Sequence, residues 1–368
     1  MIERLLLFLS RYDWLLILPV FVLTAIGLAA IYSVDISRGD TLIYFPKQVI
    51  ALVIGSICLF IGAQIHKVRY ESIAKSSYLF GLLLLAGVLL FGVTIRGTTG
   101  WFRIAGFSFQ PAEFAKVSLV LLLAWWASKQ GRRFDTWQYV LSTTLAMGFY
   151  VGLIMLQPDL GSASVLVAIW FGILFASGVK KRYLIGFVLS GVVIAIIGWL
   201  FLFQDYQKDR VLTFLQPDRD PLGSGYNVTQ SLIAIGSGKF FGRGLGFGSQ
   251  SQLHFLPEAQ TDFIIAVIGE ELGFIGLIFV IVIYFLLLWR LLTIAGQTKD
   301  DFSAYTILGI AILFFTQLFV NIGGATGLLP VTGVTLPFLS YGGSSLMINY
   351  ILIGIAGSIS REKAKIYL

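Results

Sequence analysis

The sequence predicts an all-α integral membrane protein with about ten transmembrane helices, and three observations lead to this fold class. Hydrophobic residues make up 57% of the 368-residue chain and charged residues only 12%, with a mean hydropathy of +0.87. The apolar residues recur in runs of about 17 to 25, the length that crosses a hydrocarbon core about 30 Å thick. These runs show no strict alternation of apolar and polar residues, so helices are favoured over a transmembrane barrel. We therefore expect one membrane domain over residues 1–368 rather than several soluble domains.

The expected helices follow one another along the chain, and short connections join most of them. Their spans are 14–33, 48–65, 76–95, 112–127, 138–156, 162–178, 183–203, 263–293, 304–323 and 342–359. The first run is long enough to span and has no small-residue cleavage pattern after it, so we expect an anchor rather than a cleaved signal peptide. Three stretches depart from simple connectors, namely 96–111, 204–262 and 324–341, and long loops of this kind are commonly functional.

The distribution of lysine and arginine between short loops predicts the orientation in the membrane. If the amino terminus is cytoplasmic, the loops and tails on that side carry sixteen of these residues and the short loops on the other side carry four. Those four are Arg38, Lys47, Arg96 and Arg103. The cytoplasmic side normally carries the excess. We therefore expect both termini in the cytoplasm, and the long loop between the seventh and eighth helices outside.

Composition argues against several kinds of site. Cys58 is the only cysteine, and His66 and His254 are the only histidines. The chain therefore lacks the thiols for a disulfide and a ligand set for zinc or haem. The net charge of +7 and the pI near 9.4 could suit nucleic acid. Basic residues that face anionic lipid explain this charge more simply, so we expect membrane lipids as partners and no nucleic acid.

The end of the long loop, from Leu256 to Phe263, runs directly into the helix expected at 263–293. Thr261 is a candidate N-cap, and Asp262 would then lie in the first turn, where the helix dipole favours a carboxylate. That is the structural interpretation of Asp262. A straight helix, counted back about 30 Å from Trp289, would place Asp262 about 10 Å above the hydrocarbon. Sugars and phosphates of lipids occupy that level, which favours a functional interpretation.

Four more charged residues lie near the expected membrane margin. Glu270 and Glu271 are adjacent on one helix and differ by about 100° around it, so both can hardly face one cavity. We expect them to support a site from behind, with a hydrogen-bonded structural role as the alternative. Glu113 and Lys116 lie one turn apart and can pair. An isolated charge in hydrocarbon costs roughly 2.5 to 3.5 kcal/mol, so this pair either pins its helix or places a cation near a phosphate-bearing head group.

Three other segments combine polar residues with aromatic or flexible ones. Gly100 to Arg103 is an aromatic and cationic patch that either anchors the chain at the interface or stacks on a sugar and holds an anion. The turn at 157–161 either forms an Asx-type hydrogen bond or places Asp159 in a cavity. The stretch 236–248 lacks the spacing of a nucleotide-binding loop. Its six glycines either give flexibility or, with Lys239 and Arg243, let backbone N–H groups approach a phosphate.

The stretch from Asn321 to Ser345 carries no charge and contains eight glycine and proline residues. Non-helical backbone at membrane depth is tolerated only where protein or water surrounds it. We therefore predict a re-entrant segment that packs against a cavity.

A series of short motifs follows in a definite order along nearly the whole chain. They are Tyr12–Trp14, Gly100–Arg103, Gln110–Glu113, Gln157–Gly161, Leu256–Glu258 with Thr261–Phe263, Gly269–Gly273, Gly327–Gly333, and Leu336–Phe338 with Ser340–Ser345. In this order they resemble the SEDS family (shape, elongation, division and sporulation), and its rod-shape branch most of all. Asn227 and Lys239 depart from the family pattern, in which glutamine and glycine are frequent, and could alter the contacts of the long loop.

The resemblance implies a ten-helix peptidoglycan glycosyltransferase that polymerises lipid II at the outer face of the bacterial cytoplasmic membrane during rod-shape elongation. The acceptor's GlcNAc 4-hydroxyl would attack the anomeric carbon of the lipid-linked donor, giving an inverted β-1,4 bond and releasing undecaprenyl pyrophosphate. Asp262 matches the family's essential aspartate and would act as the general base. The cations that could stabilise the departing pyrophosphate are Arg103, Lys116, Arg210 and Arg243.

The resemblance also gives an expected set of site residues and partners. The residues expected to bind substrate are Trp101, Arg103, Glu113, Lys116, Asp159, Arg210, Arg243, Glu258 and Ser344. Glu270 and Glu271 would support them. Lipid II is the expected substrate, and a class B penicillin-binding protein, which is a transpeptidase, is the expected partner. No metal held by the protein is expected, although Mg²⁺ or Mn²⁺ could assist the pyrophosphate through substrate oxygens.

Two other classes of function fit the same helices. A lipid II flippase or secondary transporter would also carry buried charges and glycine-broken segments. Its site must be reachable from both faces, whereas the polar candidates here gather near one. A scaffold that only recruits a partner synthase would not need so many polar residues in one outer region.

Overall fold

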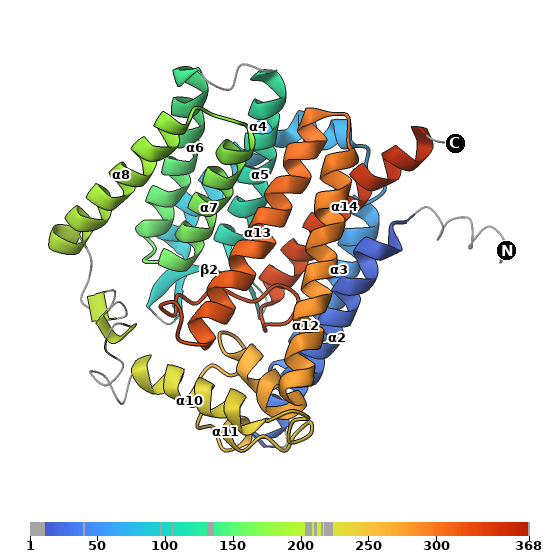
Figure 1. The fold of residues 1–368 in the computed structure, drawn as a ribbon, viewed down its shortest axis with the longest axis vertical. Coiled ribbons are helices and arrows are strands. Elements are labelled where there is room, and N and C mark those ends of the chain that lie inside the picture. Colours follow the sequence, from blue (N-terminus) through green and yellow to red (C-terminus); the bar gives the residue numbers. More distant parts are fainter. Residues whose placement is uncertain are drawn as a thin grey trace.

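The computed structural model describes residues 12–39, 41–95, 97–104, 106–130, 136–202, 208–209, 212–214, 216 and 224–366. Long helices dominate these residues (Figure 1). They are α2 (Trp14–Ile36), α3 (Phe45–Gly62), α4 (Lys67–Phe91), α5 (Pro111–Gln130), α6 (Trp137–Met155), α7 (Leu160–Ala176), α8 (Lys181–Ile197), α12 (Ile264–Gln297), α13 (Asp301–Ala325) and α14 (Gly343–Ile366). Each of the ten predicted spans overlaps one of these helices, which confirms the predicted helical membrane fold.

Most of these helices have the length and the apolar composition of a membrane span. Eight helical segments among the described residues are long and apolar enough to cross one, including α8 with its continuation into the π-helical turn Gly198–Leu202. The other two are α7, which has only 17 residues, and α5, which carries Glu113 and Lys116 on its buried surface. Because α5 packs against α4, α7 and α13, it needs no apolar outer face.

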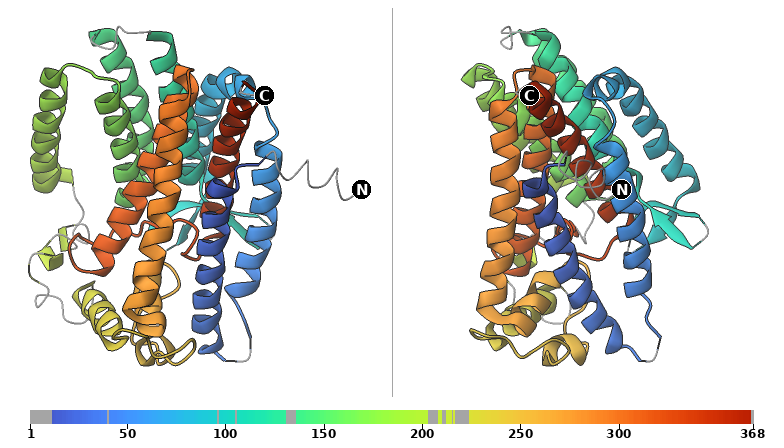
Figure 2. Two further views of the ribbon diagram at one scale, coloured as in Figure 1. Left: turned by 45° about the vertical axis from the view of Figure 1, so that its right-hand side comes forward. Right: turned by 90° about the vertical axis from the view of Figure 1, so that its right-hand side faces the viewer.

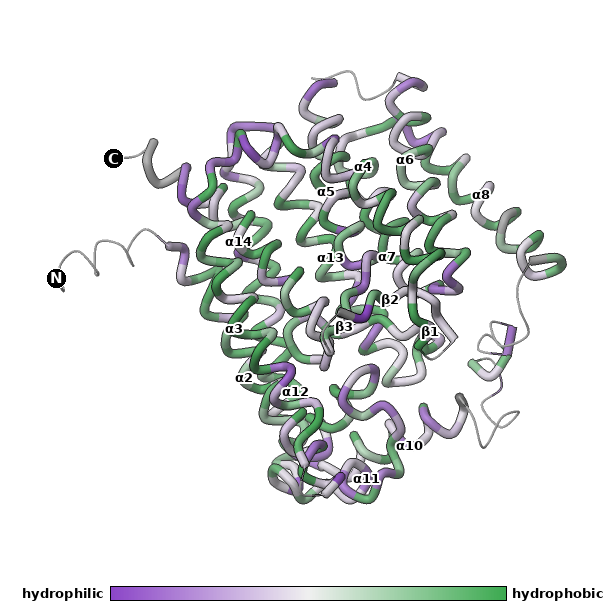
Figure 3. The backbone as a smooth tube through the Cα atoms, turned by 180° about the vertical axis from the view of Figure 1, so that it is seen from behind, coloured by the Kyte–Doolittle hydropathy of each residue, from purple (hydrophilic) through white to green (hydrophobic). Residues whose placement is uncertain are grey.

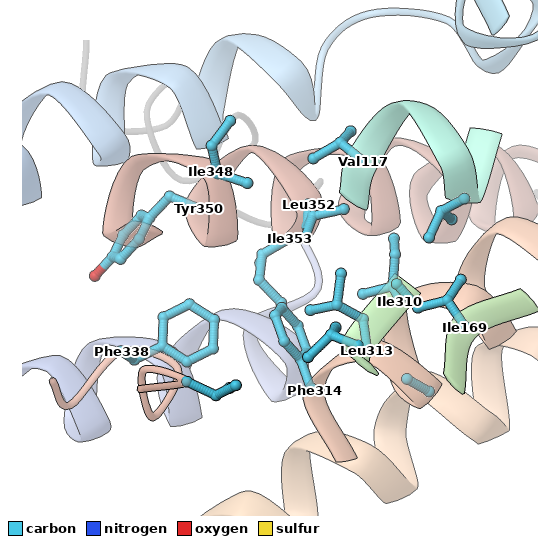
Figure 4. Packing of buried hydrophobic residues seen from close by; sticks show 14 of the residues in the cluster. Val117, Ile169, Ile310, Leu313, Phe314, Phe338, Ile348, Tyr350, Leu352 and Ile353 are labelled. Carbon is cyan, nitrogen blue, oxygen red and sulfur yellow. The ribbon is translucent and has the colours of Figure 1, made fainter. Parts of the chain in front are cut away.

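The core lies where α5, α7, α13 and α14 meet. Figure 4 shows Val117 of α5 and Ile169 of α7 among the side chains packed there. Phe338, which precedes α14, packs edge-on against Phe314 and Tyr350 with ring centroids 5.3 and 5.9 Å apart. Hydrophobic residues run along most of the helices (Figure 3), and many of their large side chains are exposed, as expected of surfaces that face lipid rather than water.

A small antiparallel sheet departs from the all-α prediction. Its strands β1 (Val93–Ile95), β2 (Thr98–Ile104) and β3 (Phe107–Phe109) pair in sequence order. Glycines with positive φ make both hairpin turns possible, namely Gly97 at 80° and Gly106 at 83°. The helix predicted to reach residue 95 therefore ends at Phe91, because the chain turns there into β-branched and aromatic residues that favour strands.

In the described part of the predicted long loop, residues 204–262, residues 208–209 and 212–214 are helical and two further helices follow. These are α10 (Ser224–Ser237) and α11 (Ser249–Gln252), which gather at one end of the molecule, at the bottom of Figure 1. α10 packs against α12 and α13, with Ala234 buried and Leu232 exposed. One face of α10 therefore packs against the bundle while the other face exposes apolar side chains.

Helix α12 is broken at Gly273, which has φ 68° and ψ −165°. A Cβ placed on Gly269 would lie only 3.2 Å from a methyl carbon of Leu277. In a straight helix, residues eight apart are separated by about 12 Å along the axis. The chain must therefore fold back sharply at the break. The expectation that Asp262 lies about 10 Å above the hydrocarbon assumed a straight helix, and that assumption is wrong.

Residues 326–342 connect α13 to α14 without forming a helix. Two glycines with positive φ, Gly327 at 70° and Gly333 at 76°, shape the path of this segment. Helix α2 approaches it closely, since a Cβ on Gly27 would lie 2.6 Å from the carbonyl oxygen of Leu339. Residues 336–340 of the segment are buried, whereas Leu328 is 74% exposed, and whether the segment enters the membrane stays a prediction. We call residues 326–342 the re-entrant segment.

The start of α2 and the end of α14 lie toward the same end of the bundle (Figure 2). Asp13, which precedes α2, accepts a bidentate hydrogen bond from Arg290 of α12, with a shortest distance of 2.7 Å. Ser360 of α14 donates to the same carboxylate at 2.6 Å. One acidic group thus ties three helices together where the chain ends meet. Which face of the membrane this end occupies stays a prediction.

Candidate active site

A cavity of about 320 Å³ lies where five helices begin. Its wall is formed by the first residues of α3, α5, α7 and α14, the turn before α12, the three strands and the re-entrant segment. The lining residues include Lys47, Trp101, Arg103, Gln110, Glu113, Lys116, Asp159, Thr261, Asp262, Thr332, Tyr341, Ser344 and Ser345. A helix N-terminus carries unpaired N–H groups and a partial positive charge. Five of them around one cavity favour an anionic ligand.

Asp262 is half-buried in this wall and lies in a turn, not in a helix. α12 begins at Ile264 with Phe263 as its N-cap, so the predicted capping role of Thr261 is wrong. The Thr261 hydroxyl instead donates to the carboxylate of Glu258 at 3.1 Å. The backbone carbonyl of Glu258 also accepts the N–H groups of Thr261 and Phe263. The turn therefore supports itself and leaves Asp262 at the cavity.

Two side chains from neighbouring elements hold the turn that carries Asp262, and neither was predicted to do so from the sequence. The amide nitrogen of Asn321, in α13, donates to the backbone carbonyl of Asp262 at 3.1 Å and to that of Val334 at 2.9 Å. Ser340 donates to the carbonyl of Thr261 at 2.7 Å. These bonds fasten the turn to the re-entrant segment. The uncharged polar residues of 321–345 were the sequence feature that could have indicated this role.

Glu113 and Lys116 form the predicted pair at the cavity wall, with 2.7 Å between Oε1 and Nζ. Both side chains are at most 5% exposed. Among the described residues, Oε2 of Glu113 has no hydrogen-bond partner. A buried acceptor of this kind normally finds a partner in the protein, in water or in a ligand. The pair therefore keeps an acceptor available at the cavity while largely neutralising the charge of Lys116.

The aromatic and cationic patch of β2 also reaches the cavity, through Trp101 and Arg103. Asp159, in the turn before α7, caps that helix by accepting from the N–H and hydroxyl of Ser162 at 2.9 and 2.7 Å. Its carboxylate also accepts from Gln110 at 3.0 Å. Both interpretations of Asp159 therefore hold together, because the Asx-type cap lies in the cavity wall.

Two residues expected to bind substrate, Glu258 and Arg243, do not line this wall. Glu258 has φ 54° and shapes the Asp262 turn, as described above. Arg243 is exposed and donates to the hydroxyl of Ser249 at 3.0 Å and to the carbonyl of Ser237 at 3.3 Å. The structure places Arg243 in the loop before α11, away from the cavity lining. Arg210 lies outside the described residues.

Residues 238–252 form a latch on the break in α12. The N–H of Phe274 donates to the carbonyl of Lys239, and the N–H of Ile275 donates to that of Phe240, at 2.9 and 3.2 Å. In return, the carbonyls of Glu270 and Glu271 accept the N–H groups of Arg243 and Gly244, each at 3.0 Å. The groups freed by the break are thus paired, as buried backbone requires.

The side chains of Glu270 and Glu271 fasten the latch. Glu270 accepts the N–H groups of Gln250 and Ser251 at 2.8 and 3.1 Å, at the start of α11. Glu271 accepts from the hydroxyl of Ser33, in α2, and from the N–H of Gly246. Neither carboxylate lines the cavity, and these hydrogen bonds match the structural alternative, so a supporting role at the site stays a prediction. The glycine-rich stretch is therefore held in close contact and is not simply flexible.

One basic residue of the wall, Lys47 near the start of α3, was not expected to bind substrate. It is one of only four basic residues in the short loops expected outside the cytoplasm, where basic residues are normally scarce. That exception was the signal for it. Thr332 of the re-entrant segment is a second addition, and its hydroxyl has no hydrogen-bond partner in the described part of the chain.

No three side chains of His, Cys, Asp or Glu gather into a metal-binding group among the described residues. The carboxylates of the wall come from separate elements, with Glu113 already paired to Lys116 and Asp159 already capping α7. Any divalent cation would therefore depend on oxygens of the substrate for much of its coordination.

Comparisons with known proteins agree over almost the full length. The family model of the FtsW/RodA/SpoVE cell cycle proteins matches residues 13–365. The probable peptidoglycan glycosyltransferase FtsW of Trichlorobacter lovleyi is 37% identical over 361 residues, covering 96% of this chain and 94% of that protein. The peptidoglycan glycosyltransferase MrdB of Escherichia coli is 37% identical over 332 residues, covering 89% and 88%.

Solved structures show the same fold. A chain of a peptidoglycan synthase complex that coordinates polymerization and crosslinking superimposes with a TM-score of 0.79 at 32% identity, covering 96% of this chain and 98% of that one. The rod shape determining protein RodA of Thermus thermophilus gives a TM-score of 0.70 at 31% identity, covering 96% and 97%. Because the relatives include both FtsW and RodA proteins, a rod-shape role stays a prediction. The chain belongs to the FtsW/RodA/SpoVE family of cell cycle proteins, the SEDS family that its motifs resemble.

Proposed function

We propose that this protein is a peptidoglycan glycosyltransferase that polymerises lipid II at the outer face of the bacterial cytoplasmic membrane. The observation that carries the proposal is the placement of Asp262 in one cavity with Trp101 and Arg103, where five helix N-termini meet. A carboxylate, an aromatic surface and a positive field are what a sugar linked to a diphosphate requires. The names of the relatives, which are peptidoglycan glycosyltransferases, support the same activity.

Asp262 acts as the general base in this reaction. Its carboxylate takes the proton of the acceptor's GlcNAc 4-hydroxyl while that oxygen bonds to the anomeric carbon of the donor. The bond from this carbon to the diphosphate oxygen breaks, and its electron pair leaves with undecaprenyl pyrophosphate. One carboxylate on the nucleophile's face suits inversion to a β-1,4 linkage. Positioned proton transfer of this kind contributes about 10² to 10⁴ in rate.

The remaining side chains of the wall bind and orient. Trp101 offers a ring on which a sugar face can stack, and the unpartnered Oε2 of Glu113 can accept a sugar hydroxyl. Asp159 is held by Gln110 and Ser162, so it serves as a fixed acceptor rather than a base. A magnesium or manganese ion carried by the substrate's phosphates would add positive charge at the leaving group.

The proposal includes an orientation and a partner. Both termini lie in the cytoplasm and the cavity serves the outer leaflet, which follows from the lysine and arginine distribution. A class B penicillin-binding protein crosslinks the strands that this protein makes. The likeness to a chain of a complex that couples polymerization to crosslinking supports such a partner.

Reconstitution in liposomes tests the function against its main alternative. The wild type should convert lipid II into glycan polymer, Asp262→Asn should not, and Asp301→Asn, an exposed aspartate at the opposite end of α13, should match the wild type. Movement of labelled lipid II across the bilayer without polymer would instead indicate a flippase. Polymer formation by Asp262→Asn at the wild-type rate would refute the base assignment.

A further inference from the structure

The first turn of α14 forms a part of the cavity that the assigned cations do not explain. Ser344 is 1% exposed, lines the cavity, and its hydroxyl has no hydrogen-bond partner among the residues that the structure describes. A buried hydroxyl without a partner is uncommon and calls for a ligand or a water. Gly342, Gly343 and Ser345 line the same surface.

The backbone of this turn adds donors to the hydroxyl. α14 begins at Gly343, and its first intrahelical bond joins the N–H of Leu346 to the carbonyl of Gly342 at 2.8 Å. The N–H groups of residues 343–345 come before that bond and have no carbonyl of α14 to pair with. Together with the dipole of a 24-residue helix, they form a surface suited to an anion.

Two basic side chains stand on the elements that touch this turn. A Cβ on Gly343 would lie 3.7 Å from Cβ of Ala51 in α3 and 3.4 Å from the ring of Phe107 in β3. Lys47 lies one helical turn before Ala51, and Arg103 lies on β2, the strand that pairs with β3. Both side chains line the cavity.

Lys116 is the weaker candidate for this charge. It lies 2.7 Å from Glu113 in a pair that is almost fully buried, so its charge is largely offset. Arg243 is hydrogen-bonded within the latch and does not line the cavity. Lys47 and Arg103 are therefore the cations of the wall that the structure leaves available to a ligand.

We propose that the first turn of α14, with the Ser344 hydroxyl, Lys47 and Arg103, is the cradle for the diphosphate of a lipid-linked substrate. This inference rests on the proposed glycosyltransferase function and names the part of the site that receives the leaving group. A diphosphate presents several acceptor oxygens and more than one negative charge, which matches a turn of N–H donors flanked by two cations.

The first test compares Ser344→Ala with Ser358→Ala, a serine of the same helix that is also 1% exposed but donates to the carbonyl of Ile65. Binding of farnesyl diphosphate to the full-length protein in nanodiscs is measured for each. Because a hydrogen bond to a charged group is lost, Ser344→Ala should bind about tenfold more weakly or worse. Ser358→Ala should bind as the wild type does.

Thermal stability separates this role from a structural one. Ser344→Ala removes a hydroxyl that has no partner among the described residues, so the protein without ligand should be as stable as the wild type or more stable. Ser358→Ala breaks a hydrogen bond and should lower the unfolding temperature. Equal diphosphate affinity in Ser344→Ala and the wild type would overturn the cradle, and so would a loss of affinity that only follows a loss of stability.

The cations are tested by Lys47→Met, with the exposed Lys299→Met at the opposite end of the bundle as the control. Lys47→Met should weaken binding and reduce its dependence on salt, because one screened charge contact is removed. Lys299→Met should change neither. A loss of affinity in Lys116→Met with none in Lys47→Met would place the diphosphate elsewhere and overturn the proposal.

The choice of probe distinguishes the cradle from the function as a whole. Farnesyl diphosphate should compete with lipid II, inorganic pyrophosphate should compete more weakly, and farnesol should not compete. If the wild type polymerises lipid II but farnesyl diphosphate does not compete, the cradle is wrong and the function stands. If the Ser344-dependent binding is present but no polymer forms under any condition, the cradle stands and the function falls.

Discussion

The latch on α12 gives a prediction in which two glycines of one loop should behave differently. Gly242 and Gly246 both have φ of 80°, so alanine is strained at either position by about 1 to 2 kcal/mol. A Cβ on Gly242 would lie 2.1 Å from the carbonyl oxygen of Glu271, whereas a Cβ on Gly246 meets nothing within 4 Å. Only Gly242→Ala must push the latch away from the helix.

The cost of that displacement follows from the four backbone hydrogen bonds that join the latch to α12. At about 1 kcal/mol each, their loss adds up to about 4 kcal/mol to the strain. We expect Gly242→Ala to be less stable than Gly246→Ala by about 2 to 4 kcal/mol, as measured by denaturation of the purified proteins under matched conditions. Because the helical segment next to Asp262 is held by the latch, polymerisation should also fall further in Gly242→Ala. Equal stability and activity in the two variants would refute the reasoning.

Three further predictions concern single contacts. Lys116→Met leaves Glu113 buried and unpaired and should cost about 3 to 5 kcal/mol in denaturation experiments, while adding Glu113→Gln should restore stability but not polymerisation. Asn321→Leu should lower kcat with little change in KM, because the amide holds the catalytic turn. The control is Gln317→Leu, one helical turn earlier, which should leave kcat unchanged because the buried amide of Gln317 has no partner among the described residues. Burial alone would raise the pKa of Asp300, but hydrogen bonds from its capped helix and a nearby lysine lower it. Asp300→Asn should therefore reduce thermal stability at pH 7, and its difference from the wild type should shrink as the pH falls below about 4 and vanish only below the lowered pKa of the folded state.

The helices could be predicted because their signal is local. A run long enough to cross the hydrocarbon specifies its own hydrogen bonds, and eight helical segments among the described residues have this length and apolar character. The sheet at 93–109 could not, because it depends on pairing between short strands and on turns at Gly97 and Gly106. The break at Gly273 was hidden for a similar reason, since the groups that compensate it come from a loop about thirty residues earlier.

The candidate site divides in the same way. Asp262, Asp159 and the pair at 113 and 116 stood out because polar residues interrupt apolar sequence at a membrane margin, and all of them line the cavity. Arg243 does not line the cavity. Its position could not be predicted, because a charge beside a glycine-rich loop gives no information on which way the loop folds. Lys47 was overlooked, although a basic residue kept against the positive-inside rule was a usable signal.

The central claim is that Asp262 performs chemistry in the cavity rather than holding the fold. Single-turnover glycosyl transfer with saturating lipid II, measured for the wild type and Asp262→Asn with lipid II binding determined in parallel, tests it most directly. If Asp262 is the general base, the rate should be lower by about 10² to 10⁴ with binding unchanged. A variant that transfers within a few-fold of the wild-type rate, or that fails only because it no longer binds or folds, would contradict it.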